Sequence, residues 1–137
     1  MKIYLWICVL INGGIGVLSL LAPLNFLGTV NIGVTAPSGI IELRAMYGGL
    51  QVGLALFVTW CLQDIKRWDS GVILMVLILL GLGITRLINW LVAMPEGFTH
   101  PMLFAIEFSG AAIGFYVRQV EMKSRHQEGG HTPGTDA

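Results

Sequence analysis

Four apolar stretches constrain this chain more than any other feature. They run over residues 3–22, 40–62, 71–94 and 101–120, and each matches the roughly 20 residues that a helix needs to cross a bilayer. The chain has 137 residues, of which 55% are hydrophobic and 12% are charged, too little charge to cover the surface of a soluble domain. Helices satisfy their own backbone hydrogen bonds in lipid. We therefore predict an all-α membrane protein that folds as a four-transmembrane-helix bundle.

The four stretches leave no room for a separate soluble domain. We expect one transmembrane domain over residues 1–122, followed by a disordered cytoplasmic tail over residues 123–137, which lacks apolar periodicity. Residues 23–39 form the longest connection, either an ordinary loop or a flap on the membrane surface. A cleaved signal peptide is disfavoured, because the first stretch is longer than a signal h-region and no small-residue cleavage site follows it.

The distribution of basic residues predicts the orientation. The connections 23–39 and 95–100 contain no Lys or Arg, whereas the N-terminus, the 63–70 connection and the C-terminal segment carry Lys2, Lys66, Arg67, Arg118, Lys123 and Arg125. The positive-inside rule places this second group in the cytoplasm. Both termini are then cytoplasmic, and we expect a multi-pass protein of the inner (plasma) membrane. The formal net charge of zero argues against a nucleic-acid partner.

Charged residues inside the apolar stretches are the first candidates for a site. Apart from Arg118, near the cytoplasmic end of the last stretch, they are Glu42, Arg44, Arg86 and Glu107, whose formal charges cancel. A charge in the bilayer is expensive, so such groups usually face the bundle interior and pair with one another. A rise of roughly 1.5 Å per residue places Arg86 about 12 Å and Glu107 about 9 Å below the outer surface. We therefore predict an ion pair between Arg86 and Glu107.

Other polar residues lie at similar depths. Tyr47 and Gln51 share a helical face with Arg44, and Asn89 shares one with Arg86. Snorkelling to the interface is an alternative explanation for the shallow Glu42 and Arg44. The predicted cluster, in the outer half of the bundle, contains Glu42, Arg44, Tyr47, Gln51, Arg86, Asn89 and Glu107. The aromatic side chains expected to line its apolar part are Trp90, Phe104 and Phe108.

Several roles are open for such a cluster. It could be a buried network that only fixes the helix register. It could be a pocket that binds an apolar or amphipathic small molecule, with Arg86 or Arg44 holding a carboxylate or a hydroxyl. The chain could also be an accessory or structural subunit of a larger membrane complex, possibly a redox complex.

Catalysis is the least favoured role. The sequence shows no nucleophile–base pair, metal-ligand cluster or phosphate-binding glycine loop. We expect no cofactor and no metal. His100 with Glu96, and the histidines His126 and His131, would make only weak metal sites.

A resemblance supports the fold. The motif E-L-R-A-x-Y-G-G-L-Q from Glu42 to Gln51, then G-x-x-R-L from Gly83 to Leu87, and then Glu107, resembles an uncharacterised bacterial four-helix membrane family, a domain of unknown function in the DoxX-like superfamily. It covers residues 3–120 and implies a four-helix bundle with both termini inside. Some members of that superfamily are subunits of respiratory or redox assemblies, and others bind sterol-like ligands in an intramembrane pocket. The resemblance therefore implies a pocket or an accessory role, and it carries over no isomerase activity.

Overall fold

The structure is a computed structural model that describes residues 1–28, 33–34, 36–93 and 98–129. Every regular element in these ranges is a helix, as the all-α prediction requires. The chain forms two compact units. The first contains residues 2–71, and the second contains residues from 72 onward together with Met1. We describe each unit by itself.

The first unit contains two long helical segments. Its elements are α1 (Lys2–Leu21), α2 (Pro23–Gly28), α3 (Pro37–Leu43), the π-helical η1 (Arg44–Gly49), α4 (Leu50–Leu62) and the short 3₁₀ helix η2 (Ile65–Arg67). Since α3, η1 and α4 follow one another without a break, residues 37–62 form one continuous helix. The helix α2 occupies the start of the connection that was predicted as a loop or flap, part of which lies outside the described residues.

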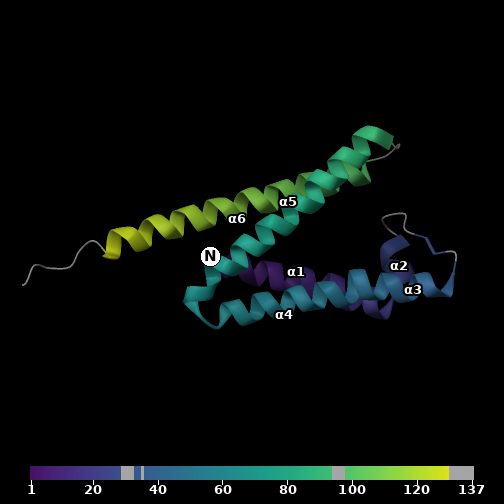
Figure 1. Ribbon diagram of the computed structural model, residues 1–137, viewed down its shortest axis with the longest axis horizontal. Helices are drawn as coiled ribbons and strands as arrows, with labels where there is room; N and C mark the ends of the chain where they lie inside the picture. The colour runs from purple at the N-terminus through teal and green to yellow at the C-terminus, as the bar shows by residue number, and fades with distance from the viewer. Residues whose placement is uncertain (29–32, 35, 94–97, 130–137) are drawn as a thin grey trace, which may run out of the picture. The chain divides into compact units, whose positions relative to one another are not determined.

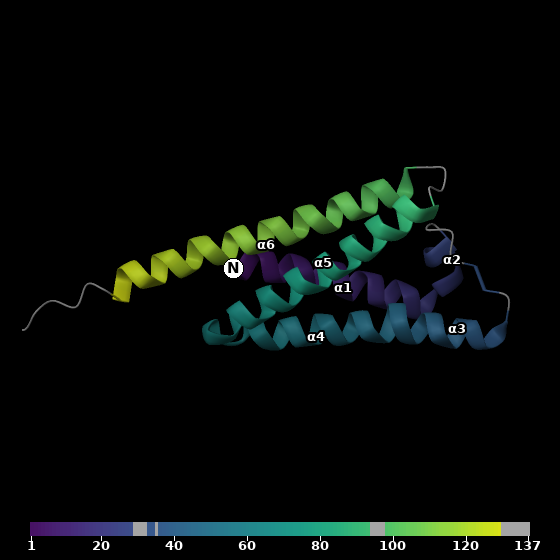
Figure 2. The ribbon, with the colours of Figure 1, turned by 45° about the horizontal axis from the view of Figure 1, so that its top comes forward.

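Small residues bring α1 and α4 close together in antiparallel orientation (Figures 1 and 2). A Cβ added to Gly16 would lie 2.9 Å from the backbone nitrogen of Val52 and 3.1 Å from the carbonyl oxygen of Gly48. One turn along, a Cβ on Gly48 would lie 2.6 Å from Cδ2 of Leu20. Close backbone approach of this kind is typical of helix packing in membranes. In contrast, a Cβ added to Gly53 would meet nothing within 4 Å.

The π-helical turn η1 interrupts the α-helical pattern within the sequence motif described above. The Leu50 N–H donates to the carbonyl oxygen of Ala45, five residues earlier. Such a turn accommodates an extra residue, and π-bulges inside α-helices frequently occur at functional sites. The helical periodicity of the sequence did not predict this feature.

The second unit is a hairpin of two long helices. Its helices are α5 (Trp68–Ala93), of which residues up to Gly71 belong to the first unit, and α6 (Thr99–Gly129). The rings of Trp90 and Phe104 lie 6.0 Å apart between centroids. Further along, a Cβ on Gly110 would lie 3.1 Å from Cδ1 of Leu79. Because residue numbers rise along α6 as they fall along α5, the two helices are antiparallel.

Three helical segments of the described chain are long and apolar enough to cross a membrane: Lys2–Leu21, Pro37–Leu62 and Ile65–Ala93. This agrees with the predicted membrane protein. The predicted fourth span, 101–120, lies within α6 and is not among them. Glu107 and Arg118 lie in this stretch and lower its hydropathy. A crossing by α6 therefore stays a prediction.

The helix α6 continues to Gly129, into the segment predicted as a disordered tail. An ion pair between Glu121 and Arg125, with N···O 3.5 Å, spans one turn of this extension. The amino group of Met1 also donates to Glu121 over 2.9 Å. This hydrogen bond, with smaller help from Arg125, lowers the pKa of the Glu121 carboxyl. Residues 130–137 lie outside the described part.

Candidate functional site

An ion pair joins the two helices of the second unit. Nη2 of Arg86 donates to Oε1 of Glu107 over 2.9 Å, and Nε donates to Oε1 and Oε2 over 3.2 Å each. Arg86 comes from α5 and Glu107 from α6. Two nitrogens thus share one carboxylate, an arrangement that fixes geometry as well as adding energy. The contact predicted from charge and depth is present.

The helix ends explain why these two residues meet. Arg86 lies seven residues before the end of α5 at Ala93, and Glu107 lies eight residues after the start of α6 at Thr99. A rise of roughly 1.5 Å per residue then puts them about 10 Å and 12 Å from the turn. Gly83, one turn before Arg86, leaves space for the acid, since a Cβ there would lie 3.4 Å from Cβ of Glu107.

Burial differs between the two partners. The Glu107 side chain is 10% exposed, whereas the Arg86 side chain is 28% exposed. The hydrogen bonds to Glu107 use Nε and Nη2 of the guanidinium, and Nη1 takes part in none of them. The acid is therefore enclosed, and part of the cation remains available to another molecule.

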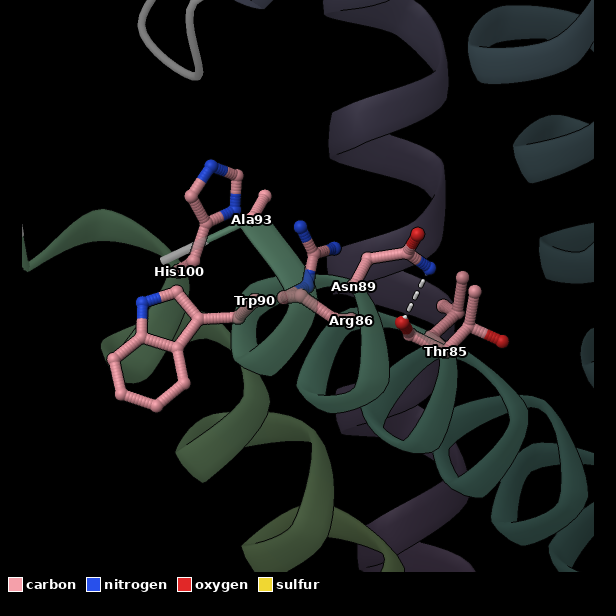
Figure 3. Close-up of a pocket in the computed structure, with 7 residues that line it drawn as sticks. Thr85, Arg86, Asn89, Trp90, Ala93 and His100 are labelled. Atoms are coloured by element: carbon pink, nitrogen blue, oxygen red, sulfur yellow. Dashed lines mark hydrogen bonds between the residues drawn. The ribbon is translucent and has the colours of Figure 1, made fainter. Parts of the chain in front are cut away.

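Arg86 lines a hollow of about 350 Å³ in the second unit. Figure 3 shows the guanidinium of Arg86 and the carboxamide of Asn89 projecting from α5, with the imidazole of His100 from α6 beside them. The full lining consists of Leu82, Thr85, Arg86, Asn89, Trp90, Ala93 and His100. The volume falls in the range of roughly 300–1,000 Å³ that is usual for small-molecule sites.

The polar groups around the hollow retain free hydrogen-bonding capacity. Nδ2 of Asn89 donates to the backbone oxygen of Thr85 over 2.8 Å, as Figure 3 shows, and this bond leaves Oδ1 as an acceptor. Nε1 of Trp90 is buried without a hydrogen-bond partner in the described structure. Buried polar groups without partners are uncommon in native proteins and call for an explanation. The Trp90 N–H is enclosed and is not open to a molecule in the hollow, whereas Oδ1 of Asn89 remains an acceptor there.

The three predicted aromatic side chains form a row along the hairpin. Phe104 lies between the other two, 6.0 Å from Trp90 and 6.5 Å from Phe108 between ring centroids. Of the three, Trp90 lines the hollow. Phe104 packs against Trp90, and Phe108 lies over Gly83 and lines a different, apolar hollow.

The remaining predicted residues belong to the first unit. Arg44 lines a smaller hollow of about 240 Å³ with Asn25, at the corner between α1 and α2. Glu42 and Tyr47 are exposed in the structure. The Gln51 side chain is half-buried, and its Oε1 is buried without a partner in the described residues.

The predicted cluster therefore divides into two groups. The hairpin brings Arg86, Asn89 and Trp90 to one hollow and holds Glu107 on Arg86. The other group comprises Glu42, Arg44, Tyr47 and Gln51, all of which lie in the first unit. The expectation that both groups meet in one site stays a prediction.

Sequence reasoning missed four lining residues, Leu82, Thr85, Ala93 and His100. Thr85 precedes Asn89 by four residues and Ala93 follows it by four, so one helical face already joined them in the sequence. His100 was considered only as a metal ligand with Glu96, which lies outside the described residues. Within the described part, no three His, Cys, Asp or Glu side chains gather where they could hold a metal ion.

Comparison with known families places the chain. A family model described as "Domain of unknown function (DUF4345)" matches residues 1–117. The chain belongs to this family. Its match includes the π-helical motif, Arg86 and Glu107, and ends within α6. No curated protein and no solved structure matches the chain.

Proposed function

We propose that this DUF4345 protein binds an apolar or amphipathic small molecule in the hollow beside Arg86. The observation that carries the proposal is the asymmetric burial of the Arg86–Glu107 pair. The carboxylate is enclosed, while part of the guanidinium lines a hollow of about 350 Å³. A pair that served only to fix helix register would need no such opening.

The lining has the composition of a binding site. Leu82, Trp90 and Ala93 supply apolar surface, and Arg86 and Asn89 supply polar groups. Small-molecule sites usually combine a mostly apolar wall with a few polar groups that orient the ligand. Ionisable residues inside membrane segments are also functional candidates by default, since their insertion is unfavourable.

The proposal includes a membrane arrangement. All four apolar stretches cross the inner membrane of a bacterium, with both termini in the cytoplasm, as the distribution of Lys and Arg favours. The hollow then lies in the outer half of the bilayer. The resemblance in the first motif supports membership of the DoxX-like superfamily, in which a four-helix bundle is the expected fold.

A retention experiment tests the binding function. The protein is extracted in a mild detergent and purified, and the small molecules that remain bound are identified by mass spectrometry. We expect one species at a constant molar ratio to the protein, and we expect Arg86→Ala to lose it. Arg67→Ala is the matched control, because Arg67 stacks on the ring of Trp60 at 4.1 Å and lies outside the hollow.

The outcomes separate the open roles. Retention of bulk lipid alone, at the same level in both variants, would contradict a specific pocket. Capture of a fixed, larger membrane protein by crosslinking in native membranes, without any retained molecule, would instead favour the accessory-subunit alternative.

A further inference from the structure

We propose that the hollow beside Arg86 selects a neutral ligand, one whose polar end is a hydroxyl or carbonyl oxygen, over the carboxylate of the same chain length. This inference rests on the proposed binding function and specifies the chemical class of its ligand. From the sequence alone, Arg86 and Arg44 were equivalent candidates to hold either a carboxylate or a hydroxyl.

The charge of Arg86 is already neutralised. Glu107 receives hydrogen bonds from two guanidinium nitrogens over 2.9–3.2 Å, so the pair has no net charge. A second carboxylate at Nη1 would enter the field of the enclosed Glu107 carboxylate. Like charges that share a site disfavour one another's ionised form. In addition, moving an anionic ligand from water into the hollow costs free energy. No unpaired positive charge is present there to offset this cost, because Glu107 already neutralises Arg86.

The hydrogen-bonding groups fit an uncharged oxygen. Nη1 of Arg86 makes none of the bonds to Glu107, so it is the donor left for a ligand. Oδ1 of Asn89 is an acceptor, and one N–H of the same amide donates to the backbone oxygen of Thr85. A hydroxyl can accept from Nη1 of Arg86 and donate to Oδ1 of Asn89, whereas a carboxylate can only accept.

The hollow around Arg44 provides a contrast within the same chain. Arg44 is the one charged residue among those described as lining that hollow, which is otherwise formed by apolar residues and Asn25. No acid holds the guanidinium there in the described ion pairs. The neutral preference is therefore specific to the hollow in which Glu107 supplies the countercharge.

A matched pair of probes tests the selectivity. Trp6, Trp60 and Trp68 are replaced with Phe, so that Trp90 is the sole tryptophan. Quenching of its fluorescence then reports a probe bound in the hollow. The detergent-solubilised protein is titrated with ω-bromodecanol and with ω-bromodecanoate in mildly alkaline buffer, where the acid is ionised. The bromine atom quenches indole fluorescence at short range. The component of quenching that disappears in Arg86→Ala is taken as specific binding.

We expect saturable quenching by the alcohol and at least tenfold weaker binding of the carboxylate. Glu107→Gln should reverse this preference, because it leaves the guanidinium unneutralised. Glu121→Gln is the control, since it removes a carboxylate from α6 outside the lining of the hollow and should leave the preference unchanged.

The remaining outcomes are distinct. If the unmodified site binds the carboxylate as tightly as the alcohol, the inference is wrong while the binding function stands. If the carboxylate gains nothing in a folded Glu107→Gln protein, the electrostatic reason is wrong. If neither probe gives saturable, Arg86-dependent quenching, the binding function itself fails. Should Glu107→Gln not fold, the comparison of the two probes on the unmodified site decides alone.

Discussion

Removing either partner of the Arg86–Glu107 pair should destabilise the hairpin strongly, and removing both should cost less than the sum. Glu107 is the more enclosed partner, with a side chain 10% exposed against 28% for Arg86. Breaking a buried pair from one side leaves an uncompensated charge, at a cost of roughly 3–5 kcal/mol. Because Arg86 is partly exposed, we expect the lower end of this range, about 3 kcal/mol, for Arg86→Ala.

The coupling between the two side chains follows from their contacts. Three donor–acceptor distances of 2.9–3.2 Å join them. Interhelical hydrogen bonds in membranes contribute on average about 0.6 kcal/mol each and at most about 1.7. A shared carboxylate with two good donors therefore gives an expected coupling of about 2 kcal/mol in a double-mutant cycle, within the usual range for residues in contact.

The assay is reversible unfolding in mixed micelles, with a denaturing detergent as the variable and far-ultraviolet circular dichroism as the readout. The set is Arg86→Ala, Glu107→Ala, the double variant and Asn89→Ala. The last is the control, because the Asn89 side chain bonds only within its own helix turn among the described interactions. Single losses that add to within about 0.5 kcal/mol would show that the two groups are independent, and the reasoning above would be refuted.

Three further predictions concern packing, pH and orientation. Gly16→Ala should destabilise the protein by about 1–3 kcal/mol, since its Cβ would lie 2.9 Å from a backbone nitrogen, whereas Gly14→Ala, with nothing within 4 Å, should be neutral in the same unfolding assay. The Met1 amino group lowers the pKa of Glu121 in the folded state. The ionised carboxylate therefore stabilises the fold at pH values above the ordinary pKa of a glutamate. This contribution is lost as the pH falls through the lowered pKa. Glu121→Gln should therefore flatten the acid side of a stability–pH profile, and an unchanged profile would argue against the contact. A Ser124→Cys protein should react with a membrane-impermeant maleimide only after the inner membrane is opened, and labelling of intact spheroplasts would reverse the proposed orientation.

The sequence could predict the helices and the central ion pair because both depend on simple regularities. Apolar length defined the helical stretches, and the similar depth of Arg86 and Glu107 on consecutive antiparallel helices predicted their contact. Depth along a helix follows from residue counting alone. The same counting placed Trp90 close enough to Arg86 to line the hollow.

Other features depend on tertiary detail that periodicity does not contain. The π-helical turn over Arg44–Gly49 departs from the α-helical periodicity that was used to assign faces. Residues before and after the turn are therefore not related by a single period of 3.6 residues. The close contact of Gly16 with Val52 joins two helices, and helical spacing relates only residues within one helix, so the sequence did not predict it.

Three aromatic residues near the predicted ion pair were expected to line one pocket, and in the structure their rings face different surroundings. Trp90 lines the hollow, whereas Phe104 stacks against Trp90 and Phe108 covers Gly83. Which side of its helix each ring covers depends on its rotamer, which cannot be deduced from spacing.

The most direct test of the account is a crystal structure of the protein purified gently from its own membranes and grown in a lipid mesophase. The account predicts non-protein density in the hollow, with an uncharged oxygen within hydrogen-bonding distance of Nη1 of Arg86. It also predicts that the Glu107 carboxylate still accepts hydrogen bonds from Nε and Nη2 of Arg86. Density for acyl chains against the guanidinium, with Glu107 turned away, would contradict it.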